Sequence, residues 1–200
     1  MLKIKSQPYN SVWICADTQE ELNRTFMRFT EHYESPNPLF KDKIFTVGQL
    51  KAWYSETYGA DTYDVDWSGF NIPSSVLKSF KDGLFDPLTS EEQNLLNLFK
   101  YRHDNFYIIG AQNNSVLRHE LCHALYAYNK IYQTKVNLIC DKFKKELLKT
   151  SKYILNKGYH KDVLNDELQA YITDNDDSFI IKHTPQNIIT KFNKLYEEYK

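Results

Sequence analysis

Two histidines and a glutamate have the spacing of a metal site that activates water. The segment 116–125 has the sequence Val-Leu-Arg-His-Glu-Leu-Cys-His-Ala-Leu and contains His119-Glu120-x-x-His123. Residues four apart lie on the same face of an α-helix, so the two imidazoles can bind one zinc ion. Glu120 projects about 100° round the helix from His119 and can reach a water molecule on that ion. The pattern therefore predicts a zinc site with Glu120 as its general base.

A catalytic zinc ion needs a third protein ligand, which must come from elsewhere in the chain. In the segment 163–172 apolar residues recur at a spacing of four, and Glu167 takes a place in one such row where a core residue is expected. A carboxylate turned inward is costly unless it meets a cation or a metal, so Glu167 is the preferred third ligand. It can also lie at the edge of the row and pair with a lysine. The rival ligands are His160, Asp166 and His183.

Two tyrosines are candidates for stabilising the negative charge that develops on a carbonyl oxygen. Tyr126 follows His123 by one turn on the same flank of the helix, and Tyr171 follows Glu167 by one turn. Both can instead be aromatic core residues.

The zinc ligands depend on a helix that packs by one face and presents the histidines on another. We expect this helix over 115–129, with an apolar stripe on the side away from the histidines. A β-branched and aromatic strand over 105–110 precedes it, and a helix over 161–173 carries Glu167. These elements place the core of the metal site at about residues 105–174.

The remaining elements are mainly helical. Thr18, Thr46 and Thr89 each begin a capping-box pattern, which predicts a helix after each of them. We also expect a strand at 11–16, an irregular segment at 61–73, a short helix from Ser74, a lysine-rich helix at 134–150, a strand at 178–181 and a last helix after Pro185. The chain contains no convincing linker. We therefore predict one α+β domain over residues 1–200, mainly helical with a small sheet.

The composition excludes several classes of function. The net charge of −1 gives no electrostatic case for binding nucleic acid or an anionic membrane. No apolar run is long enough to cross a bilayer and the N-terminus has no signal-peptide pattern, so we expect a cytoplasmic protein. The three cysteines lack the Cys-x-x-Cys spacing, which favours reduced thiols.

Taken together, His119-Glu-Leu-Cys-His123 and Glu167-Leu-Gln-Ala170 resemble the gluzincin branch of zincin metallopeptidases. The resemblance covers residues 105–174. It implies a zinc ion held by His119, His123 and Glu167, and an edge strand at 106–110 to which an extended peptide can add. Tyr126 and Asn129 stand where metzincins have a glycine and a third histidine, so the resemblance does not extend to that branch.

The sequence departs from many gluzincins at one position. They have an aspartate four residues after the glutamate ligand, which orients a ligand histidine, whereas this chain has Tyr171. That role would pass to Asp174 or another acid.

Three hypotheses on function follow from these observations. The leading one is a zinc-dependent peptidase acting on a peptide or protein substrate. The loop 66–71 can form a wall of its cleft, or it can be a plain surface loop. The alternative is a zincin-like module that binds or regulates a partner without catalysis. The third is a helical structural protein with a coincidental motif.

Overall fold

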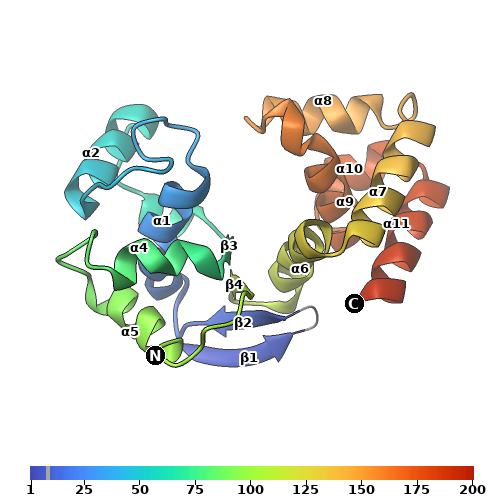
Figure 1. The fold of residues 1–200 in the computed structure, drawn as a ribbon. Helices are drawn as coiled ribbons and strands as arrows, with labels where there is room; N and C mark the ends of the chain where they lie inside the picture. Colours follow the sequence, from blue (N-terminus) through green and yellow to red (C-terminus); the bar gives the residue numbers. More distant parts are fainter. Residues whose placement is uncertain (8–9) are drawn as a thin grey trace. The chain divides into compact units, whose positions relative to one another are not determined.

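The chain folds into two compact units, Met1–Gln112 and Asn113–Lys200, in a computed structural model that describes residues 1–7 and 10–200. Helices account for 61% of the described residues, and the strands among them form one sheet of four (Figure 1). The predicted α+β class with a mainly helical chain is therefore confirmed. The single domain over 1–200 stays a prediction, and each unit is described by itself.

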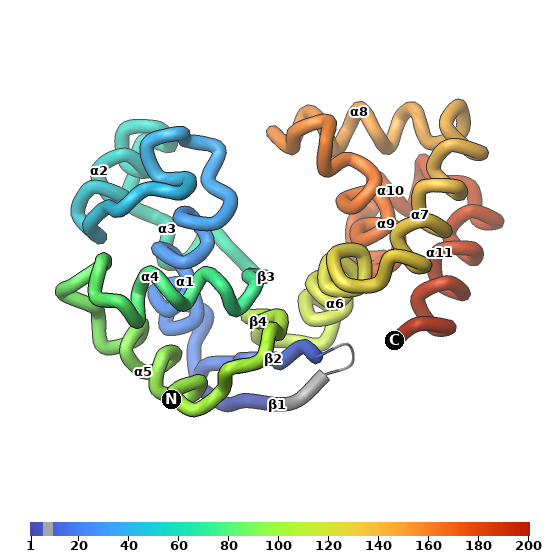
Figure 2. The backbone as a smooth tube through the Cα atoms, viewed as in Figure 1, coloured from blue at the N-terminus to red at the C-terminus, as the bar shows by residue number. Residues whose placement is uncertain are grey.

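The sheet lies in the first unit, and its strand order is β1-β2-β4-β3. Its strands are β1 (Lys3–Gln7), β2 (Ser11–Cys15), β3 (Gly69–Pro73) and β4 (Tyr107–Ala111). Neighbouring strands are antiparallel except for β2 and β4, which run parallel although nearly a hundred residues separate them along the chain (Figure 2).

The prediction that an edge strand precedes the helix of His119 and His123 is wrong. β4 pairs with β2 on one side and with β3 on the other, so no peptide can add to it. The physical reason lies in its sequence, Tyr-Ile-Ile-Gly-Ala, whose five residues are all buried and therefore need neighbours all round. Among the described strands, β1 and β3 are the ones at the edges of the sheet.

Helices flank the sheet in the first unit. They are α1 (Gln19–Glu34), α2 (Val47–Tyr58), α3 (Tyr63–Asp66), α4 (Leu77–Lys81), α5 (Ser90–Leu98) and the 3₁₀ helix η1 (Ser74–Val76). The capping boxes at Thr46 and Thr89 are confirmed. The segment 61–73, expected to be irregular, contains α3 and β3. Tyr63 and Phe70 are buried there, and this tertiary packing outweighs the polar local composition.

The second unit is entirely helical. Its helices are α6 (Asn114–Tyr128), α7 (Lys130–Lys142), α8 (Leu148–Asn156), η2 (Lys161–Val163), α9 (Leu164–Asp174), α10 (Ser178–His183) and α11 (Gln186–Tyr199). α9 contacts each of the five other α-helices of this unit, so it is the central helix (Figure 1). The side chains along α9 are consequently held on several sides.

Two of the predicted elements in this unit differ from the structure. The lysine-rich helix expected over 134–150 is two helices, because α7 ends at Lys142 and α8 begins at Leu148. The strand expected over 178–181 is the helix α10. The carboxylate of Asp177 accepts hydrogen bonds from the amides of Phe179 and Ile180, and this N-cap overrides the β-propensity of the segment.

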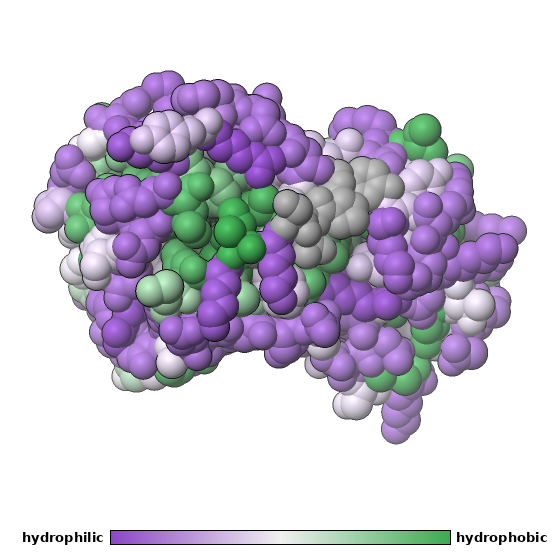
Figure 3. Space-filling model, turned by 90° about the horizontal axis from the view of Figure 1, so that it is seen from below, coloured by the Kyte–Doolittle hydropathy of each residue, from purple (hydrophilic) through white to green (hydrophobic). Residues whose placement is uncertain are grey.

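Three general properties concern the thiols, the surface and the hydrophobicity of the helices. Cys15, Cys122 and Cys140 are free thiols. Hydrophilic residues predominate on the face seen in Figure 3, where a group of hydrophobic residues is exposed among them. None of the helices in the described ranges combines the length and the hydrophobicity that a membrane span requires.

Candidate metal centre

Three potential ligands converge where α6 packs on α9. His119 and His123 lie one turn apart on α6, with their ring centroids 4.9 Å from each other. Glu167 projects toward them from the first turn of α9, and its Oε1 atom lies 3.9 Å from His123 Nε2. One ligand atom from each of the three residues lies within 4.8 Å of the other two. The predicted set His119, His123 and Glu167 is therefore brought together within one unit.

A carboxylate lies within hydrogen-bond distance of the Nδ1 atom of each histidine. His119 Nδ1 lies 2.6 Å from Asp174 Oδ2, and His123 Nδ1 lies 2.9 Å from Asp166 Oδ1. A hydrogen bond at Nδ1 fixes the ring orientation and the tautomer, so the lone pair of Nε2 is left for a metal. Both imidazoles are thus prepared as ligands through the same nitrogen.

Asp174 is itself held in position at the end of α9. Its Oδ1 atom accepts a hydrogen bond of 3.1 Å from the amide of Asp176, whose own carboxylate accepts one from Ser115 at the start of α6. Arg118 also links the two helices, because its Nε donates to the carbonyl of Thr173 at 2.9 Å. The residue before His119 therefore fixes the end of the helix that carries its orienting carboxylate.

Glu167 is a buried carboxylate beside the two histidines. The residue is only 8% exposed, and its Oε2 atom is buried without a hydrogen-bond partner in the part of the chain that the structure describes. Burial raises the pKa of this carboxyl group against the opposing effects of His123 and His119. A buried carboxylate oxygen without a partner is costly, and a cation bound beside it would remove that cost. The group His119, His123 and Glu167 could therefore hold a metal ion.

The negative charges around His123 also favour a bound cation. Burial lowers the pKa of this imidazole, but the carboxylates of Asp166, Glu167 and Glu120 outweigh burial and raise it well above its ordinary value. The site therefore concentrates negative charge on a buried histidine, which also favours a bound metal cation. Glu120 is buried on α6, and its charge acts on His123, Glu167 and Tyr159, so its carboxylate lies beside the ligand group.

Two tyrosines lie next to the ligand group. The ring of Tyr171 packs edge to face against His119, with centroids 4.7 Å apart. Its hydroxyl group lies 3.1 Å from the hydroxyl group of Tyr159, which precedes η2. Burial and the charge of Glu167 raise the pKa of Tyr159, so its hydroxyl group stays protonated and can donate. Tyr126, the other predicted candidate, donates its hydroxyl hydrogen to Asn137 of α7 at 2.9 Å.

The rival third ligands have other partners. His160 is exposed, and its Nδ1 lies 3.2 Å from Asp162 Oδ2. The ring of His183 stacks on Phe179, and its Nδ1 atom contacts the backbone carbonyl of Phe179. Asp166, considered from the sequence as a ligand, instead holds His123. Of the four candidates, the structure brings Glu167 to the two histidines.

Sequence analysis missed Asp166 as an orienting group, Arg118 as a link between helices, and Tyr159 beside the ligands. Asp166 directly precedes Glu167, and a helix turns about 100° between neighbours, so its reach to the second histidine could have been tested by helical geometry. Nothing local marks Tyr159 or Arg118. The contact of Arg118 depends on how α6 packs on α9, and that of Tyr159 depends on how the segment after α8 packs on α9.

Comparisons with protein-family models, curated proteins and solved structures found no match to this chain. Inference about its activity therefore rests on the chemistry of the residues at the site.

Proposed function

We propose that this chain is a zinc-dependent peptidase of the gluzincin type. The observation that carries the proposal is the convergence of His119, His123 and Glu167, with both histidines held through Nδ1 by carboxylates and the glutamate buried with an unpartnered oxygen. Two imidazoles and one carboxylate are the protein ligands in one class of catalytic zinc site, and catalytic sites keep a further position for water or substrate.

Zinc, when bound, would lower the pKa of a water molecule and polarise the carbonyl group of the substrate. Glu120 would accept the proton of that water as it attacks the scissile peptide carbonyl, and would then give the proton to the leaving nitrogen. Its place on the helix, directly after His119 and before His123, keeps its carboxylate beside the ligands.

The Tyr159–Tyr171 pair supports the same reaction. Because their hydroxyl groups lie 3.1 Å apart, one can donate to the other, and the accepting group keeps its own proton for a second hydrogen bond. That proton would stabilise the oxygen on which negative charge develops. Tyr171 and Tyr159 are therefore preferred to Tyr126 for this role, since the Tyr126 hydroxyl group already donates to Asn137.

The experiment that tests the proposal separates metal binding from hydrolysis. Replacing Glu120 by Gln keeps the volume of the side chain but removes the base. We expect Glu120→Gln to retain one zinc ion per chain and to lose about 10²-fold or more of the hydrolysis of a peptide library, followed by mass spectrometry. Glu146→Gln, the same replacement at an exposed position of the second unit, is the matched control and should keep both properties.

Unchanged cleavage by Glu120→Gln would sink the proposed mechanism. A zinc-loaded wild-type chain that binds peptides without cleaving any would favour the alternative, a zincin-like binding module. A chain without zinc would favour the third hypothesis, a coincidental motif.

A further inference from the structure

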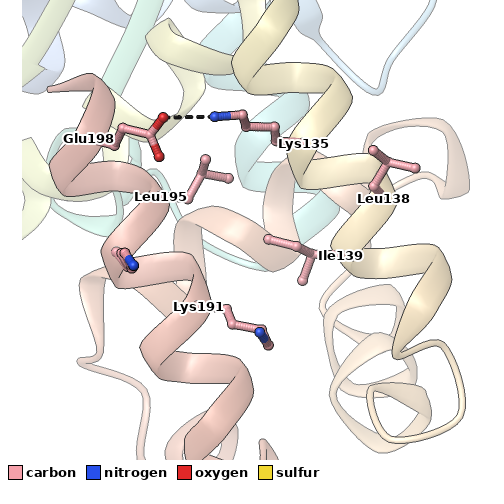
Figure 4. Close-up of a pocket in the computed structure, with 7 residues that line it drawn as sticks. Lys135, Leu138, Ile139, Lys191, Leu195 and Glu198 are labelled. Carbon is pink, nitrogen blue, oxygen red and sulfur yellow. Dashed lines mark hydrogen bonds and ion pairs between the residues drawn. The ribbon is translucent and has the colours of Figure 1, made fainter.

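A groove between α7 and α11 lies outside the metal centre and shares no residue with it. Its volume is about 330 Å³, and it is lined by Lys135, Leu138, Ile139, Lys191, Lys194, Leu195 and Glu198. Figure 4 shows Leu195 of α11 and Ile139 of α7 facing one another across the groove. Figure 4 also shows the ion pair of Lys135 and Glu198 bridging the two helices, at 2.7 Å. The groove therefore has apolar side chains between its walls and charged groups at its rim.

The apolar surface continues along α7. Ile131 and Leu138 are each 63% exposed, although both are large aliphatic residues. They are seven residues apart, so they lie on the same face of the helix. Both walls of the groove are helices, of 13 and 14 residues, and at about 1.5 Å per residue each provides a contact length of about 20 Å.

The charge at the rim is predominantly positive. Lys135 is neutralised by Glu198, but within residues 1–7 and 10–200 neither Lys191 nor Lys194 forms an ion pair. The unit as a whole has the same bias. Asn113–Lys200 carries 14 Lys and Arg residues against 11 Asp and Glu residues. Six of these acids lie in the metal centre or in the loop after α9, so the rest of this surface is basic. The six acids are Glu120, Asp166, Glu167, Asp174, Asp176 and Asp177.

We propose that this groove binds an acidic amphipathic helix of a partner protein. A furrow between two helices accepts a third helix, whose apolar residues would contact Leu138, Ile139 and Leu195. Glutamates or aspartates on its flanks would face the unpaired Lys191 and Lys194, which gives charge complementarity. A flat bilayer surface does not follow such a furrow, and an apolar floor gives nucleic acid no polar contacts. The chemistry therefore favours an acidic helix.

The test uses the full chain and two synthetic peptides. The first is a helical peptide of about 18 residues, long enough to form a helix, with leucines on one face and glutamates elsewhere. The second has a lysine at each glutamate position. We expect the acidic peptide to bind about tenfold more tightly than the basic one in fluorescence anisotropy, with the difference shrinking as salt is raised.

Variants locate the binding. Leu138→Asp removes the exposed apolar anchor and should weaken binding of the acidic peptide about tenfold or more. Lys191→Glu combined with Lys194→Glu should weaken it by about tenfold at low salt and less at high salt. Lys149→Glu combined with Lys152→Glu makes the same charge change on α8, which does not line the groove, and should have a much smaller effect. Far-UV circular dichroism and the melting temperature establish that each variant is folded.

Three results would overturn the proposal. The first is equal binding of the acidic and basic peptides, or binding of the acidic peptide that Leu138→Asp leaves unchanged. The second is recruitment of the chain to phosphatidylglycerol vesicles that is lost in Leu138→Asp, which would assign the face to a membrane. The third is a dimer of the chain that depends on Leu138, which would assign the face to a second copy.

Discussion

Removing the carboxylate that holds His119 should weaken zinc binding more than removing the one that holds His123. Asp174 Oδ2 lies 2.6 Å from His119 Nδ1, and the Asp174 side chain is 9% exposed. Asp166 Oδ1 lies 2.9 Å from His123 Nδ1, and the Asp166 side chain is 22% exposed. A shorter hydrogen bond in a less hydrated place depends more strongly on the charge of its acceptor.

The magnitude follows from this geometry. Carboxylates that orient ligand histidines contribute about 10- to 100-fold to metal affinity, or about 1.4–2.7 kcal/mol. We expect Asp174→Ala near the upper end of this range. Asp166→Ala should fall near the lower end, because Asp166 Oδ1 also accepts a hydrogen bond from Gln169 and is more hydrated. Asp174→Asn keeps an acceptor without the charge and should lie between the two.

The assay is competition for zinc with a chromophoric chelator at fixed pH and ionic strength. The chain offers a matched control in Asp162, which lies 3.2 Å from the Nδ1 atom of His160 but outside the ligand group. These two side chains are 75% and 69% exposed, so their pair contributes little. Asp162→Ala should change zinc affinity by about twofold or less.

Two outcomes would refute this reasoning. One is a zinc affinity of Asp174→Ala equal to that of the wild-type chain. The other is an equal loss in Asp162→Ala and Asp174→Ala, since the effect would then not come from the orienting hydrogen bond.

Three further predictions concern stability. Without zinc, Glu167→Gln should melt at a higher temperature than the wild type, because the variant lacks a buried carboxylate. At a zinc concentration of about 100 Kd the wild type should gain about 2.7 kcal/mol of stability, so the order of the two melting temperatures should reverse. Calorimetry with and without chelator checks this, and an unchanged order would contradict it. Gly110→Ala should destabilise the first unit by about 1–3 kcal/mol in urea unfolding, because a Cβ atom there would lie 2.7 Å from the ring of Phe26. Gly48→Ala is the control. It makes no comparable contact and should not destabilise the unit. Burial raises the pKa of Glu31, so the folded chain holds this proton to a higher pH than the unfolded chain. The folded chain therefore loses stability as the pH rises above 4.5, the ordinary value of the group. Glu31→Gln should flatten this fall in melting temperature, and an unchanged slope would contradict the prediction.

The three candidate ligands could be predicted, because helix geometry places the two histidines together and the apolar row singles out Glu167. The spacing of His119 and His123 places both on one face whatever the rest of the chain does. Glu167 was recognisable because a carboxylate replaced an apolar residue in a row of core positions, and the structure buries it.

The contacts that orient the ligands depend on tertiary packing. The sequence named Asp174 as one acid that could orient a histidine, but its contact with His119 depends on how α9 packs on α6. Tyr159 approaches Tyr171 because the chain turns back after α8. Neither distance is encoded in a local pattern.

The same limit explains the errors in the fold. The strand β4 was predicted from its composition, but its central place depends on β2 and β3, which are distant in the sequence. The segment Ser178–His183 has the β-branched and aromatic residues of a strand, yet the N-cap at Asp177 and the packing of Ile180 make it a helix. Contacts between distant segments decided the first outcome, whereas the second depended on a local N-cap together with the burial of Ile180.

The central claim is that His119, His123 and Glu167 together hold one zinc ion. Elemental analysis of the purified full chain after dialysis tests it most directly, with His123→Ala and Glu167→Ala measured beside the wild type. We predict one zinc ion per wild-type chain and loss of zinc from both variants. Zinc far below one ion per chain in the wild type, or full retention in His123→Ala, would contradict the claim.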